Sequence, residues 1–83
     1  MKRQDGAGGD LDLRGLKCPL PVLRTRKALR ALGPGDRLTV HCTDPLAAID
    51  IPHLLHETGD HLDGVAEHDG VLSFAIRRAD PPG

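Results

Sequence analysis

Cys18 is the residue of this sequence with the clearest potential for chemistry, and it lies in the run Gly15-Leu16-Lys17-Cys18-Pro19-Leu20-Pro21. A helical pattern begins at Pro19, so we expect Cys18 to be the N-cap of a helix. The N–H groups and the dipole at a helix N-terminus favour a negative charge. Arg14 and Lys17 precede the cysteine, and no acidic residue is close to it along the following chain. These features predict a lowered thiol pKa and a nucleophilic thiolate.

The position three residues after the cysteine distinguishes this motif from a dithiol redox motif. A Cys-x-x-Cys motif has its second cysteine there, whereas this sequence has Pro21. A mixed disulfide or a persulfide on Cys18 therefore has no neighbour within the motif to resolve it. Such a site is suited to holding a sulfur atom until the thiol of a partner takes it. The alternative is that Cys18 is a small apolar residue at a strand–helix junction.

The elements that must position Cys18 can be predicted from hydrophobic periodicity. Alternating leucines over residues 11–14 indicate a strand. A helical pattern covers residues 19–32 and stops at Gly33-Pro34. Residues 37–42 alternate again, which predicts a second strand whose last residue, Cys42, faces inward.

A second helix is expected after a turn at Asp44-Pro45, where the aspartate would be the N-cap. Because Pro52 would break a long helix, we expect this helix to run only from about residue 50 to residue 58. The Asp69-Gly70 pair is then flanked by alternating apolar runs within residues 61–78, which predicts a hairpin.

The expected hairpin fixes which side chains face the core. A two-residue turn places Val65 opposite Phe74, so Val65 is predicted to face the core. Leu62 is out of phase with Val65, and Gly64 between them predicts a bulge that resets the alternation.

The element order βαβαββ predicts an α+β fold, a two-layer sandwich with two helices on one face of a four-stranded mixed sheet. The first two strands should be parallel, so their C-terminal ends, with Cys18 and Cys42, should meet at one edge. We expect a single domain over residues 10–79, between flexible tails at residues 1–9 and 80–83.

The composition favours a small, reduced protein of the cytoplasm. The chain has 83 residues, a net charge of −1 and only two cysteines, which are too few for a disulfide framework. The polar N-terminus lacks the apolar region of a secretory signal, and no apolar stretch is long enough to span a bilayer. The overall charge indicates no attraction to nucleic acid or to a membrane.

Charge is nevertheless uneven along the chain. Residues 38–76 contain no Lys or Arg but seven acidic residues. The first helix carries four basic residues, namely Arg24, Arg26, Lys27 and Arg30. We interpret them as a docking surface for an acidic protein partner, because the helix has no aromatic residue for stacking on RNA bases. The alternative is a solvated helix face.

Two further sets of residues carry weaker alternatives. Cys42 is predicted at the same sheet edge as Cys18, so a disulfide is geometrically possible, but a core thiol is the preferred interpretation. His53 and His56 are three residues apart and precede Glu57, which is a possible metal pair. No spacing matches a structural zinc motif, and we expect no metal site.

The stretch Leu11–Pro21 resembles the TusA/SirA-like sulfur-carrier family, whose signature is Cys-Pro-x-Pro after a strand end that bears a glycine. The segments Gly33–Val40, Asp44-Pro45 and Asp50-Ile51 fit the second strand, the following turn and the second helix of that family. The resemblance covers roughly residues 10–78 and implies the same βαβαββ sandwich. Leu20 stands where the best-known tRNA-relay members have an acidic residue.

This resemblance implies a cytoplasmic persulfide carrier, a sulfurtransferase in the carrier sense, with Cys18 as the catalytic sulfur acceptor. The supporting motif residues would be Arg14, Gly15, Lys17, Pro19, Leu20 and Pro21. The donor would be a cysteine desulfurase or a rhodanese, and the acceptor a downstream relay protein. The sulfur would end in tRNA 2-thiolation, molybdenum-cofactor assembly or sulfur oxidation.

The resemblance implies no cofactor beyond the covalent persulfide sulfur carried as cargo. A monomer without direct contact to nucleic acid or membrane is expected. Two other functions stay open at this point: a non-catalytic regulatory or protein-binding module that uses the basic first helix, and a thiol redox switch formed by Cys18 and Cys42.

Overall fold

The secondary-structure elements follow one another in the predicted order βαβαββ. The computed structural model describes residues 8–79. Its elements are β1 (Gly8–Leu13), α1 (Leu20–Arg30), β2 (Arg37–Cys42), α2 (Ala47–Thr58), β3 (His61–His68) and β4 (Val71–Arg77). β1 begins two residues before the expected domain boundary, because Gly8 and Gly9 pair with the start of β2. The rest of the expected tails, residues 1–7 and 80–83, lies outside the described residues.

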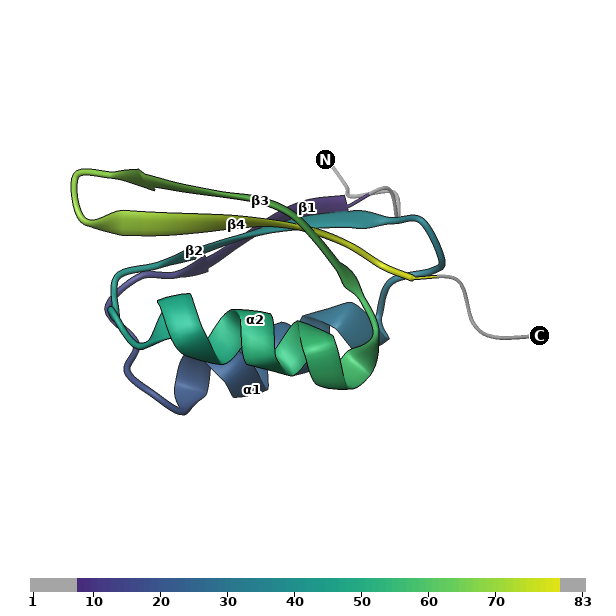
Figure 1. The fold of residues 1–83 in the computed structure, drawn as a ribbon, viewed down its shortest axis with the longest axis horizontal. Helices are drawn as coiled ribbons and strands as arrows, with labels where there is room; N and C mark the ends of the chain where they lie inside the picture. Colours follow the sequence, from purple (N-terminus) through teal and green to yellow (C-terminus); the bar gives the residue numbers. More distant parts are fainter. Residues whose placement is uncertain (1–7, 80–83) are drawn as a thin grey trace.

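The four strands form one mixed sheet in the order β1-β2-β4-β3. β1 is parallel to β2, whereas β4 is antiparallel to both of its neighbours. Both helices lie on the same face of the sheet (Figure 1), which confirms the predicted α+β two-layer sandwich. In the β1–β2 register Leu13 is opposite Cys42. The two chain segments that leave these strands therefore start side by side at one edge of the sheet.

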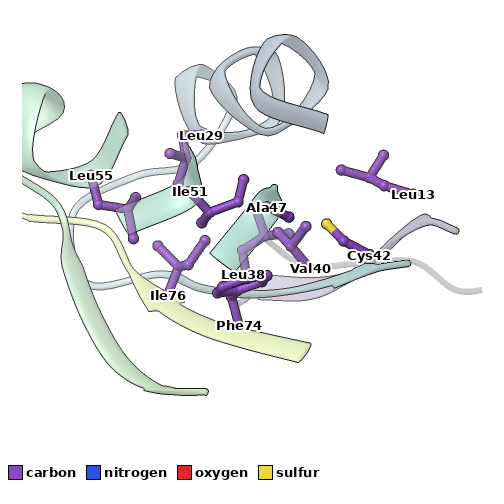
Figure 2. Close-up of a cluster of buried hydrophobic side chains, with 10 residues drawn as sticks. All are labelled: Leu13, Leu29, Leu38, Val40, Cys42, Ala47, Ile51, Leu55, Phe74 and Ile76. Carbon is purple, nitrogen blue, oxygen red and sulfur yellow. The ribbon is translucent and has the colours of Figure 1, made fainter. Parts of the chain in front are cut away.

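The core lies between the sheet and the helices and is almost entirely aliphatic. Inward positions of β2 and β4 supply Val40, Phe74 and Ile76, each at most 1% exposed. Leu29 of α1 and Ile51 of α2 cover them from the helix layer, as Figure 2 shows. This packing follows from the period-two alternation of the strands and the helical spacing of the leucines. It fixes both helices against the sheet and thereby sets the position of the loops at their N-terminal ends.

The second helix differs from the prediction, since α2 begins at Ala47 and contains Pro52 in its interior. The chain becomes helical early because Oδ1 of Asp44 accepts a hydrogen bond from the Leu46 N–H at 3.1 Å. Pro52 has no N–H to donate to the carbonyl of Ala48 four residues earlier. The helix nevertheless continues through this residue to Thr58, so the prediction that the proline breaks it is wrong.

The hairpin has the predicted turn and the predicted bulge. Asp69 and Gly70 both have positive φ, 51° and 81°, as a type I′ turn requires. The register shifts between Leu62 and Gly64, and Val65 stands opposite Phe74. The prediction that Val65 faces the core is wrong, because this residue is 51% exposed. β3 is an edge strand of the sheet, and the hairpin extends beyond the helices (Figure 1).

Candidate functional site

Cys18 lies in the connection between β1 and α1, and its side chain is exposed. The expectation that Cys18 is the helix N-cap is wrong by one residue. Pro19 is the N-cap, Leu20 is the first helical residue, and the buried Pro21 is the second. Neither proline has an N–H to direct at the sulfur, and the N–H of Leu20 donates to the carbonyl of Lys17. The helix N-terminus therefore does not provide the expected charge stabilisation directly at Cys18.

Hydrogen bonds to the loop after β2 hold the cysteine loop in place. The N–H of Cys18 donates to Oδ2 of Asp44 at 2.7 Å, and the N–H of Gly15 donates to Oγ1 of Thr43 at 2.8 Å. The hydrogen bond from the Cys18 N–H is the main cause of the lowered pKa of Asp44, to which the charge of Lys17 contributes. Gly15 has φ of +85°, a conformation that favours glycine. Asp44 is thus a positioning residue, whereas the sequence predicted only its role in starting a helical turn.

The electrostatic environment of Cys18 is the opposite of the one predicted. A hydrogen bond with the Asp50 carboxylate raises the pKa of the Cys18 thiol, and lost solvation and the charges of Asp50 and Asp44 raise it further. The prediction of a lowered pKa counted charges along the chain, whereas both carboxylates come from the segment after β2. A carboxylate close to a thiol disfavours the thiolate.

Arg14, one of the two basic neighbours expected to favour the thiolate, is already paired. Its Nε donates to Oδ1 of Asp12 at 2.8 Å, and its Nη2 donates to Oδ2 at 3.0 Å. These bonds lower the pKa of Asp12 to about 2. Lys17 is exposed, and the causes that shift the Cys18 pKa include neither cation.

A pocket of about 240 Å³ opens beside Cys18 between the two helices. Its walls are Cys18, Pro19 and Val22 on the α1 side and Asp50, His53, Leu54 and Glu57 on α2. Within it, Nε2 of His53 is 3.4 Å from Oε2 of Glu57, and Nη2 of Arg26 is 3.8 Å from Oε1 of the same residue. The pocket therefore combines apolar walls with two carboxylates beside an exposed thiol.

Sequence reasoning missed Asp50, His53 and Glu57 as neighbours of Cys18. Their spacing of three and then four residues places them on one face of a helix, which was a signal available in the sequence. Which way that face points depends on how α2 packs against α1, and no local pattern determines that packing.

Cys42 is a core residue with no exposed surface. Figure 2 shows its sulfur between the labelled side chains of Val40 and Leu13. Burial, together with the charge of Asp44, raises the pKa of this thiol. Both cysteines are free. The preferred interpretation of Cys42 as an inward-facing core thiol is confirmed, and its thiol is closed to attack by a partner in the folded protein.

The basic residues of α1 do not form one patch around Cys18. Arg24, Lys27 and Arg30 are exposed, while Arg26 is half-buried and faces Glu57. At a rise of 1.5 Å per residue, Arg30 lies about 15 Å further along the helix axis than Leu20. The exposed basic surface thus runs along α1 away from the cysteine.

Exposed apolar side chains, which the sequence did not lead us to expect, lie at the N-terminal ends of the two helices. Leu20 and Leu23 in the first turn of α1 are 41% and 53% exposed. Leu46 and Ile49 are 51% and 67% exposed. They are close in sequence to Asp44 and Asp50, the two carboxylates that raise the pKa of Cys18. We call these four residues the apolar rim. Large exposed apolar side chains are typical of a protein–protein interaction site when they form a patch.

Residues 8–79 contain no group of three or more His, Cys, Asp or Glu side chains arranged to hold a metal ion. His53 is paired with Glu57, and His56 is exposed on the same helix. Neither helix in this part of the chain is long and apolar enough to cross a membrane.

The fold and the site define a small α+β sandwich with an exposed free cysteine at a strand–helix junction. The comparison with known proteins specifies the family, because the profile named Sulfurtransferase TusA matches residues 9–78. The chain belongs to this family, and its membership supports a sulfur-carrier role.

The alignments with related proteins cover most of this chain and most of each relative. A Neisseria meningitidis protein named as a candidate sulfur carrier is 45% identical over 67 residues, covering 81% of this chain and 90% of the relative. The sulfur carrier protein TusA of Allochromatium vinosum is 39% identical over 70 residues, covering 84% and 92%. The crystal structure of a SirA-like protein from Desulfitobacterium hafniense superimposes with a TM-score of 0.76 at 29% identity, covering 86% and 97%. The fold predicted from the sequence is therefore the fold of this family.

Proposed function

We propose that this protein accepts sulfane sulfur as a persulfide on Cys18 and passes it to the thiol of an acceptor protein. The observation that carries the proposal is the pairing of an exposed Cys18 with a fully buried Cys42. The sulfur held on Cys18 then has no second thiol of the same molecule within reach to release it. Family membership supports the same role.

Each transfer exchanges one sulfur–sulfur bond for another. The Cys18 thiolate attacks the outer sulfur of a donor persulfide, a new bond forms at Cys18, and the donor cysteine leaves as a thiolate that takes up a proton. The reverse attack, by an acceptor thiolate on the outer sulfur carried by Cys18, unloads the protein. No net oxidation occurs, so the relay needs no redox cofactor, and the covalent sulfur is its cargo.

For the donor we propose a cysteine desulfurase or a rhodanese-type protein, and for the acceptor a downstream relay protein. The sulfur would then reach tRNA 2-thiolation, molybdenum-cofactor assembly or sulfur oxidation. The apolar rim and the exposed basic residues of α1 suit a partner with an apolar patch beside an acidic one. The protein would act as a monomer in the cytoplasm, without direct contact to nucleic acid.

The test is sulfur uptake by the intact protein. Incubation with a cysteine desulfurase and cysteine is expected to add the mass of one sulfur atom, and a reducing agent is expected to remove it. Cys18→Ala should abolish the uptake, whereas Cys42→Ala should retain it. Undiminished uptake by Cys18→Ala would contradict the proposal.

Two further measurements, thiol titration after mild oxidation and partner binding, separate the carrier from its alternatives. A redox switch would give an intramolecular disulfide after mild oxidation, with loss of both free thiols in the parent protein. A binding module would retain its partner in Cys18→Ser and lose it when Arg24 and Lys27 are replaced by Glu. A carrier is expected to keep two titratable thiols after mild oxidation and to need Cys18.

A further inference from the structure

The Asp50 carboxylate lies beside Cys18, where it opposes formation of the thiolate that sulfur transfer requires. A thiolate is the nucleophile in sulfur transfer, yet Asp50 lies beside Cys18 in the same pocket and raises the pKa of the Cys18 thiol, which disfavours the thiolate. Asp50 lies in the first turn of α2 and is half-buried in the wall of the pocket that Cys18 also lines. This arrangement favours the protonated thiol, which is the less reactive form of a cysteine.

The remaining charges around the thiol do not offset this effect. The charged or titratable groups near it come from four segments, namely Lys17 in the cysteine loop, Asp44 after β2, Arg26 of α1, and Asp50, His53 and Glu57 of α2. Asp44 also accepts the Cys18 N–H and adds negative charge. Arg26 faces Glu57, which lies about two helical turns beyond Asp50 along α2.

The pocket has the composition of a receptor for a long cationic side chain. Pro19, Val22 and Leu54 give it apolar walls, against which the aliphatic part of a lysine or an arginine can pack. Asp50 and Glu57 place two carboxylates in the same pocket. Its volume of about 240 Å³ leaves room for one such side chain beside the thiol.

We propose that a lysine or arginine of the sulfur donor enters the pocket that Cys18 and Asp50 share, pairs with Asp50 and thereby releases the Cys18 thiolate. This inference rests on the proposed sulfur transfer. When the cation neutralises Asp50, the thiol proton passes to solvent and the Cys18 thiolate attacks the outer sulfur of the donor persulfide. The sulfur–sulfur bond of the donor breaks, and its cysteine leaves as a thiolate. The Cys18 thiol then reacts readily with a docked partner and slowly with other electrophiles.

The first experiment follows alkylation of Cys18 by iodoacetamide against pH, without any sulfur donor. At neutral pH and low salt, Asp50→Asn is expected to react about tenfold faster than the parent, with its pH profile moved to lower pH, because the nearby negative charge is gone. Asp50→Glu keeps the charge and should stay close to the parent. Asp63→Asn removes an exposed carboxylate of β3 that lies outside this pocket, and as the control it should leave the profile unchanged.

The second experiment tests the preference for a cation directly. Two methanethiosulfonate reagents, one with a trimethylammonium group and one with a sulfonate group, are compared on the parent and on Asp50→Asn. The parent should react several times faster with the cationic reagent, after correction by their rates with a small thiol, and this ratio should fall toward one in Asp50→Asn. High salt should reduce the preference of the parent, because it screens charge.

Two results would overturn the inference: an Asp50→Asn protein with the pH profile of the parent, or a parent that prefers the anionic reagent. Neither depends on a sulfur donor. If the parent takes up no sulfur from a desulfurase while these profiles follow expectation, the proposed function fails and the control of Cys18 by Asp50 stands. If sulfur uptake succeeds and the profiles coincide, the carrier function stands and this inference fails.

Discussion

At the residue scale, Cys18 shows what a linear motif can and cannot specify. The sequence identified it by its two following prolines and by the missing second cysteine, and the structure places it at the surface. The sequence could not reveal that Asp44 and Asp50 surround it, because that contact depends on where α2 packs. The sign of the pKa shift of Cys18 was wrong for the same reason. The sequence motif thus predicted which cysteine is exposed, but it did not predict the direction of the pKa shift of that cysteine.

Gly15 supports a prediction about the loop that carries this cysteine. Gly15→Ala is expected to lower the free energy of unfolding by about 1 kcal/mol, because an alanine at positive φ is strained. A Cβ at this position meets no atom within 4 Å, so the cost comes from the backbone alone. Urea denaturation measures it.

Gly64→Ala is the matched control for Gly15→Ala. A Cβ at Gly64 also meets nothing within 4 Å, and φ at this position is outside the positive range. The control should change the midpoint of unfolding little. Equal losses in the two variants would contradict the role of the left-handed backbone at Gly15.

At the element scale, the hairpin was predictable and the second helix was only partly so. The Asp69-Gly70 turn and the bulge at Gly64 depend on residues adjacent in sequence, and both are present. The start of α2 depends on the Asp44 carboxylate, which also holds the N–H of Cys18. Because one side chain serves both elements, the beginning of α2 and the cysteine loop are structurally linked.

The corner between α2 and β3 carries the second stability prediction. The buried Asp60 carboxylate accepts hydrogen bonds from Thr58 Oγ1 at 2.8 Å, from Arg78 Nη1 at 3.1 Å and from the Ala79 N–H at 2.8 Å. Asp60→Ala is expected to lower the free energy of unfolding by about 2–3 kcal/mol, because it removes the acceptor that these donors share. Urea or thermal denaturation measures this loss.

Asp63→Ala provides the comparison for Asp60→Ala within the same strand region. Asp63 pairs with Arg77 at 3.2 Å, but both side chains are about two-fifths exposed, at 42% and 41%. Exposed ion pairs contribute little to stability. A loss in Asp63→Ala as large as that in Asp60→Ala would show that burial of the Asp60 carboxylate is not the deciding factor.

At the scale of the whole molecule, the sandwich followed from the strand and helix periodicities and the turn residues between them. Leu38, Val40 and Cys42 were predicted to share the inner face of one strand, and all three are buried. Val65 was misplaced because alternation gives the face of a residue but not whether a helix covers it. The two-layer arrangement and the topology could therefore be predicted from the sequence. How far the helices extend over the sheet could not.

The carboxylates of the whole domain predict its behaviour in acid. The pKa values of Asp12, Asp44 and Asp63 are lowered in the folded protein, mainly by hydrogen bonds from Arg14, Cys18 and Arg77, respectively. A lowered folded-state pKa gives stability that is present above the ordinary value of 3.8 and is lost as the pH falls through the lowered values. The urea midpoint should therefore fall between about pH 5 and about pH 2.

A double variant isolates the contribution of two of these groups. Asp12→Asn with Asp63→Asn leaves the Cys18 loop and Asp44 intact and should flatten the decrease in acid. Parallel pH curves for the parent and the double variant would show that these two carboxylates do not drive the loss of stability.

The hydrogen bond between Asp50 and the Cys18 thiol has one more consequence, because it joins two parts of the chain that only folding brings together. When α2 detaches from α1, the thiol loses its carboxylate neighbour and regains the acidity of an ordinary cysteine. The alkylation rate of Cys18 therefore reports on tertiary structure. It is low in the native state and higher in a partly opened one. The protein would therefore be marked by electrophiles or captured by mixed-disulfide formation most readily when it is misfolded.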